Sequence, residues 1–169
     1  MKKIILAGGC FWGVEAYYKR LRGILQTTVG YTDAKGKNPT YEDVCKQSGH
    51  AEAVLVEYDE LLISLDKILE HFFRIVNPTT VNRQGNDIGI QYRSGIYLVD
   101  GSDLEKVQNY LNSIKNKYLL PIQTTCKLAS EFYDAENYHQ DYLDKVPGGY
   151  CHINLHLAKQ DELKEEYRD

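Results

Sequence analysis

The sequence lacks any long hydrophobic run. Its N-terminus begins with Met1, Lys2 and Lys3, and only four apolar residues follow, from Ile4 to Ala7. A secretion signal needs an apolar stretch of roughly 7–15 residues, and a membrane-spanning helix needs about 18. We therefore expect a cytoplasmic protein without a membrane segment.

The sequence also lacks the Cys-x-x-Cys pairs of zinc sites and the basic stripe of nucleic-acid-binding proteins. The formal net charge is −4, so we expect no nucleic-acid partner. The four cysteines lie at positions 10, 45, 126 and 151. Without a secretion signal, isolated cysteines favour catalysis over structural disulfides. We expect no metal and at least one candidate nucleophile, and a buried inert cysteine is the alternative.

No repeat, low-complexity tract or linker interrupts the 169 residues. Domains usually run to about 100–200 residues. We therefore expect a single domain over residues 1–169, with residues 146–169 as a C-terminal tail. One tryptophan stands against fourteen tyrosines, and phenols can line polar pockets.

Hydrophobic periodicity predicts the secondary structure. Apolar or alternating runs indicate strands at residues 3–7, 24–31, 52–58 and 94–99. Helical spacing indicates helices at residues 14–21, 65–76 and 103–118. Residues 77–93 are predicted to form a long loop, and residues 153–157 alternate like a strand. The order of these elements predicts an α+β fold, a ferredoxin-like split-βαβ sandwich whose mixed or antiparallel sheet has helices on one face.

Cys10 lies where the first predicted strand meets the first predicted helix, within residues 8–13 (GGCFWG). Unpaired backbone N–H groups and the helix dipole stabilise a thiolate at a helix N-terminus, so we predict a lowered pKa for Cys10. The flanking glycines let the backbone turn tightly and leave the sulfur accessible. Phe11 and Trp12 either form an apolar slot beside the sulfur or simply pack in the core.

Residues 9–13 (GCFWG) resemble the active-site motif of the A-type peptide methionine sulfoxide reductases. Further segments match this family in the same order: residues 49–52 (GHAE), 85–94 (GNDIGIQYRS), 135–140 (AENYHQ) and 149–151 (GYC). The resemblance runs from about residue 4 to residue 153. Several motifs in order are far more specific than one.

The resemblance implies reduction of the S epimer of methionine sulfoxide, free or within oxidised proteins and peptides. It implies no metal or bound cofactor, and an external reductant, thioredoxin or dithiothreitol. Cys10 would attack the sulfur and become a sulfenic acid, and Phe11 and Trp12 would hold the S-methyl group. We expect a monomer.

Glu52 begins a predicted strand of otherwise apolar residues, where burial would raise its pKa and keep it protonated. A surface glutamate on an edge strand is the alternative. The resemblance implies that Glu52 is the acid and that Tyr41 and Tyr92 donate hydrogen bonds to the substrate oxygen. By the same analogy Asp87 helps to fix the site and binds water or the substrate backbone, although it could equally be a turn residue.

Cys151 follows Pro147, Gly148 and Gly149, a flexible approach near the C-terminus. A sulfenic acid condenses readily with a nearby thiol. We therefore expect Cys151 to resolve Cys10 as a disulfide, and the resemblance supports this pairing and its reduction by thioredoxin. Cys126, near the end of the last predicted helix, stays open as the alternative, and Cys45 is expected to be structural, in a short helix after Tyr41.

Two other function classes remain open. A cysteine hydrolase would pair Cys10 with His50 or His139 and would consume no reductant. A non-catalytic ferredoxin-like binding domain would leave Cys10 unreactive.

Overall fold

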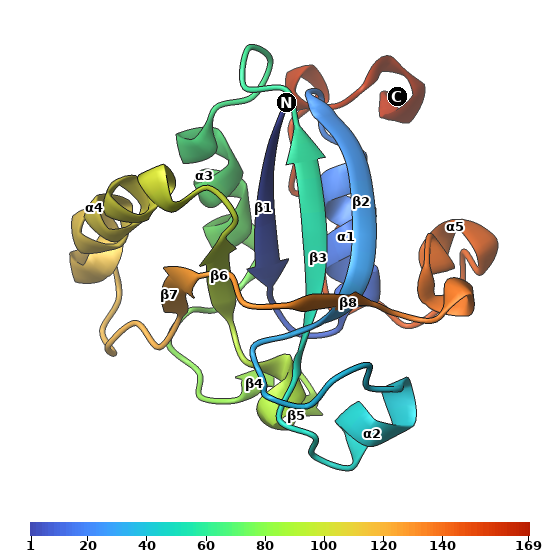
Figure 1. Ribbon diagram of the computed structural model, residues 1–169. Coiled ribbons are helices and arrows are strands. Elements are labelled where there is room, and N and C mark those ends of the chain that lie inside the picture. Colours follow the sequence, from blue (N-terminus) through green and yellow to red (C-terminus); the bar gives the residue numbers. More distant parts are fainter.

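The computed structural model describes residues 1–169, and a six-stranded sheet forms its centre (Figure 1). The strand order is β7-β6-β1-β3-β2-β8, in which only β7 runs parallel to its neighbour. The strands are β1 (Lys2–Ala7), β2 (Ile24–Thr32), β3 (Ala51–Tyr58), β6 (Gly95–Leu98), β7 (Thr125–Leu128) and β8 (Phe132–Asp134). The expected mixed α+β class is confirmed, and the sheet has two more strands than the sequence predicted.

The sheet is strongly curled. Its two edge strands, β7 and β8, are joined only by residues 129–131. Four Cα–Cα steps reach about 14 Å, whereas six flat strands would separate the outer pair by about 24 Å. The connection therefore passes across the front of the sheet, as Figure 1 shows for β8. Small side chains on this inner face, Ala7, Ala51 and Ala53, make room for it.

The helices pack on the other face of the sheet. Every second residue of β1 and β3 joins a cluster of 26 buried residues that also includes side chains of all three long helices. These helices are α1 (Phe11–Lys19), α3 (Leu65–Ile75) and α4 (Leu104–Ile114). In α3 the buried residues Ile68, Leu69 and Phe72 form the predicted apolar stripe, and each such side chain contributes roughly 1.5–3 kcal/mol on burial.

Several boundaries differ from the predictions. The helix expected over residues 103–118 ends at Ile114 and continues as a single 3₁₀ turn, Lys115–Lys117. The strand expected at residues 153–157 is absent, because this segment follows irregular backbone. The long loop at residues 77–93 contains a small hairpin of β4 (Arg83–Gln84) and β5 (Asp87–Ile88), and then a 3₁₀ turn, Ile90–Tyr92. Two short helices complete the chain: α2 (Tyr41–Cys45) and α5 (Tyr142–Lys145).

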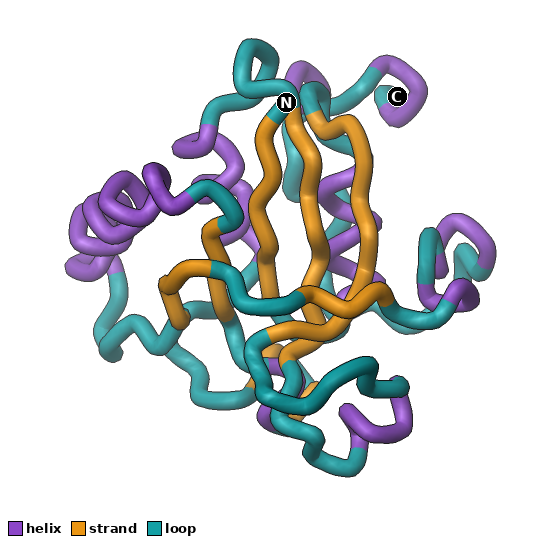
Figure 2. Tube along the Cα trace, viewed as in Figure 1, coloured by secondary structure: helices purple, strands orange, loops and turns teal.

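The C-terminal segment is fixed to the body of the protein. Figure 2 shows the chain after β8 as loops and short helical turns. Nevertheless, Ile153, Ala158 and Leu163 belong to the buried core. Leu163 also forms an isolated antiparallel bridge with Leu21, just after α1.

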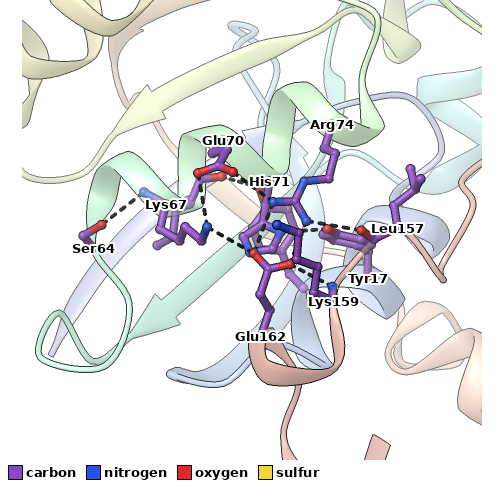
Figure 3. Close-up of polar contacts among 11 residues, drawn as sticks. Tyr17, Ser64, Lys67, Glu70, His71, Arg74, Leu157, Lys159 and Glu162 are labelled. Carbon is purple, nitrogen blue, oxygen red and sulfur yellow. Dashed lines mark hydrogen bonds and ion pairs between the residues drawn. The ribbon is translucent and has the colours of Figure 1, made fainter. Parts of the chain in front are cut away.

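Glu162 is the polar anchor of this segment (Figure 3). Its carboxylate accepts hydrogen bonds from Arg74 at 2.8 and 3.1 Å and from the Lys159 backbone N–H at 2.8 Å. Lys67 lies 3.1 Å away and the buried His71 3.5 Å away. Burial opposes ionisation, but these donors outweigh it and hold the pKa of Glu162 well below its usual range. The chain downstream of Cys151 is therefore tied to α3.

No helix of this structure combines the length and the apolar character needed to cross a membrane.

Candidate active site

Cys10 occupies the junction of β1 and α1, as predicted. It is the N-cap residue of α1 and its side chain is buried. Gly9, with a φ of +86°, makes the turn from strand to helix in a backbone conformation that favours glycine. The sulfur therefore lies at the helix N-terminus, but within the protein interior.

Burial reverses the expected effect on Cys10. Desolvation disfavours the thiolate and raises the pKa of Cys10 above the ordinary cysteine value, and the nearby charge of Glu52 adds to the rise. The backbone N–H of Trp12 acts in the opposite direction, as a helix N-terminus should, but it is outweighed. The prediction of a lowered pKa was wrong, because helix position is a local property and burial is not.

Glu52 is buried, with 1% of its surface exposed. It lies on β3, which β1 and β2 flank on both sides, so the edge-strand alternative does not hold. Its Oε1 accepts the Phe11 backbone N–H at 3.3 Å, which places the carboxyl beside the residue after Cys10. Its Oε2 has no hydrogen-bond partner in the protein. Burial raises the pKa of Glu52 to about 8, against the Phe11 hydrogen bond and with help from the charge of Asp87.

Tyr41 and Tyr92 approach the same carboxyl from different segments. Tyr41 begins α2, and Tyr92 ends the 3₁₀ turn at Ile90–Tyr92. Burial and then the charge of Glu52 raise the pKa of both phenols. Both hydroxyls therefore keep their protons at neutral pH and can act as donors. Three groups able to donate a proton or a hydrogen bond thus gather near Cys10.

Phe11 and Trp12 have different environments. Phe11 is buried and packs against Tyr31 and His139, with ring centroids 5.6 and 5.2 Å away. Trp12 is half-buried and stacks on Tyr142 of α5 at 3.8 Å. Trp12 is therefore the more accessible aromatic beside the nucleophile.

Asp87 lies on β5 and contacts the C-terminal segment. Its Oδ2 accepts the Tyr150 hydroxyl at 3.0 Å and lies 4.0 Å from Nδ1 of His152. These two residues flank Cys151. Asp87 therefore touches the segment that carries the candidate resolving thiol.

Cys151 is close to the first turn of α1. A Cβ atom added to Gly13 would lie 3.1 Å from Cys151 Sγ. The sulfur donates to the backbone oxygen of Ile153 at 3.2 Å, and all four cysteines are free thiols. The flexible approach predicted for this segment is thus held in place by specific contacts.

The other two cysteines are elsewhere. Cys126 lies on β7, opposite Ile96 of β6, and not at the end of a helix as expected. Cys45 ends α2, as expected, but it is exposed, so the structural role predicted for it has no packing to support it. Neither cysteine shares the contact that Cys151 makes with α1.

Neither candidate histidine forms a hydrogen bond with Cys10. His50 bonds to Ser48 Oγ and to the Gly36 carbonyl, both at 2.9 Å. Nδ1 of His139 accepts the Trp12 indole N–H at 3.0 Å. Both rings are thus oriented by other groups, and the Cys–His arrangement of a hydrolase is not formed. No group of three or more His, Cys, Asp or Glu residues is placed to hold a metal ion.

Glu136 is a site residue that the sequence reasoning missed. Its Oε2 accepts the backbone N–H of Tyr41 at 2.9 Å, and its Oε1 accepts the Tyr31 hydroxyl at 2.8 Å. It therefore sets the position at which α2 begins. The only signal for it was its place in the AENYHQ segment at residues 135–140.

We expect alkylation of Cys10 to be slow at neutral pH and still rising above pH 9. A pKa raised by burial leaves less thiolate at pH 7 than in an unfolded chain, whose cysteines ionise near pH 8.5. The measurement is the iodoacetamide reaction of wild-type protein, followed by mass spectrometry of the Cys10 peptide from pH 6 to about 10, with the chain in denaturant as control. A plateau below pH 8.5 would contradict the raised pKa.

Comparison with known proteins supplies the context for this geometry. A family profile described as "Peptide methionine sulfoxide reductase" matches residues 2–169. The peptide methionine sulfoxide reductase MsrA of Clostridium perfringens is 53% identical over 156 residues, which cover 92% of this chain and 99% of that protein.

Two solved structures are similar as well. Mxr1 from Saccharomyces cerevisiae in its reduced form has a TM-score of 0.81 at 37% identity, covering 97% of this chain and 92% of that one. Mxr1 in complex with Trx2 has a TM-score of 0.58 at 29% identity, covering 83% and 84% of the two chains.

Proposed function

Since the chain belongs to the peptide methionine sulfoxide reductase family and reduces methionine sulfoxide with thiols, we propose that Cys10, Glu52 and Cys151 perform its two half-reactions. The observation on which the proposal depends is the buried carboxyl of Glu52, whose Oε2 is unpaired beside a buried cysteine. Such a group keeps its proton at neutral pH and has no acceptor for it within the protein. A substrate oxygen would provide that acceptor.

In the first half-reaction the Cys10 sulfur attacks the sulfoxide sulfur. Glu52 delivers a proton to the sulfoxide oxygen, and Cys10 loses its own proton, so no net proton is consumed. The S–O bond of the substrate breaks, the oxygen passes to Cys10 as a sulfenic acid, and methionine leaves. Tyr41 and Tyr92 donate hydrogen bonds to the oxygen as charge develops on it. Trp12 holds the S-methyl group, and Phe11 supports the same wall from behind.

In the second half-reaction Cys151 attacks the sulfenic acid and forms the Cys10–Cys151 disulfide with release of water. Thioredoxin then reduces the disulfide in the cell, and dithiothreitol does so in vitro. The complex of Mxr1 with Trx2 supports thioredoxin as the partner. No bound cofactor or metal takes part in this scheme.

The remaining expectations are proposals of the same kind. The enzyme takes the S epimer, free or within oxidised proteins and peptides, and acts as a cytoplasmic monomer. Residues 1–169 form one domain, with residues 146–169 as its C-terminal tail. The strands in the order β6-β1-β3-β2, with α1 and α3 on one face, support a ferredoxin-like split-βαβ unit to which β7 and β8 add the two edges.

The test is one round of reaction without reductant. Reduced enzyme, given excess S- or R-epimer of a methionine sulfoxide peptide, should form one methionine per chain from the S epimer only, and should end as a Cys10–Cys151 disulfide. Cys151→Ser should still form one methionine but should stop as a sulfenic acid, which dimedone labels. If Cys151→Ser still forms an intramolecular disulfide with Cys10, another cysteine resolves the intermediate and the assignment of Cys151 is wrong.

A further inference from the structure

His152, the residue after Cys151, is bound to the backbone next to the nucleophile. Its Nε2 lies 3.0 Å from the carbonyl oxygen of Gly8, two residues before Cys10. A carbonyl can only accept, so Nε2 carries the hydrogen and donates it. The side chain of His152 is 6% exposed, and its Nδ1 has no hydrogen-bond partner. Nothing in the two half-reactions described above uses this buried ring.

The two glycines on either side of Cys10 leave the space that His152 and Cys151 occupy. A Cβ atom at Gly9 would lie 2.8 Å from His152 Nε2. One at Gly13 would lie 3.1 Å from Cys151 Sγ. Both distances are shorter than ordinary van der Waals contact. The strand–turn–helix segment around Cys10 is therefore shaped to receive the Cys151–His152 pair.

The chain on either side of this pair is anchored at some distance. Upstream, Glu15 accepts the Asp141 backbone N–H at 2.7 Å, which fixes the start of α5. Downstream, Glu162 ties the chain to α3. Between these anchors, the Tyr150–Asp87 hydrogen bond joins exposed or half-buried groups. The His152–Gly8 bond is the buried polar contact nearest to the resolving thiol.

We propose that His152 is the positioning residue of the second half-reaction: its Nε2–H bond to the Gly8 carbonyl holds Cys151 beside Cys10. This inference rests on the proposed function. In the step concerned, the Cys151 sulfur bonds to the Cys10 sulfur and the S–O bond of the sulfenic acid breaks. The oxygen leaves as water with the thiol proton. Cys151 is oxidised, the sulfenic acid is reduced, and no other reactant is needed.

Positioning decides the rate of this step because it makes an encounter between two chain segments effectively unimolecular. If the Gly8 bond is lost, residues 146–158 can move between their outer anchors, and the thiol spends less time within reach of Cys10. The first half-reaction does not involve this bond and keeps its rate. The disulfide should therefore form at least about tenfold more slowly while methionine forms as before.

Two substitutions that differ by one methylene group test this. A glutamine amide reaches the position of histidine Nε2, whereas an asparagine amide reaches only that of Nδ1. Reduced His152→Gln and His152→Asn are mixed with an S-sulfoxide peptide without reductant and quenched over time. Methionine, disulfide and the dimedone adduct of Cys10 are measured separately. His156→Asn is the matched control, since His156 is exposed and only its backbone N–H is bonded.

We expect wild-type rates of methionine formation in all variants. His152→Asn should accumulate the dimedone adduct and form the disulfide slowly, and His152→Gln should recover most of the wild-type rate. Equal disulfide rates in the Asn and Gln variants, or an equal slowing of methionine formation, would overturn the inference. Failure of the wild-type chain to form methionine would instead refute the proposed function, so the two failures are distinguishable.

Discussion

Replacing Cys10 by serine is expected to abolish methionine formation, with a loss of at least about 10⁴-fold. A serine hydroxyl is a far weaker nucleophile at neutral pH than a thiol, and no histidine bonds to this position to activate it. The sulfenic acid that stores the substrate oxygen cannot form on serine either. The measurement is methionine released from the S-epimer peptide with dithiothreitol supplied.

Cys126→Ser is the matched control for this experiment. Cys126 lies on β7 and is paired with β6, so it should keep wild-type turnover. Equal losses in the two variants would indicate a general effect of removing a thiol. Substantial turnover by Cys10→Ser would remove Cys10 from the mechanism.

Replacing Glu52 by glutamine is expected to slow the first half-reaction by about 10²–10³-fold. The amide oxygen can still accept the Phe11 N–H, so the local structure should persist. An amide can donate a hydrogen bond to the sulfoxide oxygen, but it cannot transfer the proton. Single-turnover measurement of methionine formation isolates this step from disulfide formation.

The pH dependence gives Glu52→Gln a second, independent signature. The active pair has a protonated Glu52 and an ionised Cys10, which contains one proton fewer than the fully protonated pair. Because the pKa of Glu52 is raised to about 8, the wild-type rate should climb with pH and level off near that value. In Glu52→Gln this break should vanish, and the rate should climb until Cys10 itself ionises.

Glu57→Gln provides the control on the same strand. Glu57 lies on β3, half-buried, 4.0 Å from Lys3. Its substitution should leave both the rate and the break near pH 8 unchanged. A wild-type rate in Glu52→Gln would show that another group protonates the oxygen, and Tyr41 and Tyr92 would be the next candidates.

The elements that the sequence predicted well are those with many residues in regular spacing. The helix with Ile68, Leu69 and Phe72 on one face was predicted to within a residue at its end. The short edge strands β7 and β8 were missed, because three or four partly exposed residues contain too little periodicity. The alternating segment at residues 153–157 was wrongly predicted as a strand. Alternation alone does not provide a neighbouring strand, and this segment has none.

The sequence by itself determined the family, the main helices and strands, and the place of Cys10 where a strand meets a helix. These depend on local order along the chain, which a reader of the sequence can see directly. Only the tertiary structure decided that Glu52 is buried, that the pKa of Cys10 is raised, and that Cys151 rather than Cys126 lies against α1. Burial and proximity are set by contacts between segments far apart in sequence, and electrostatic effects depend on both. The chemistry of this site therefore follows from residues whose positions no local pattern could specify.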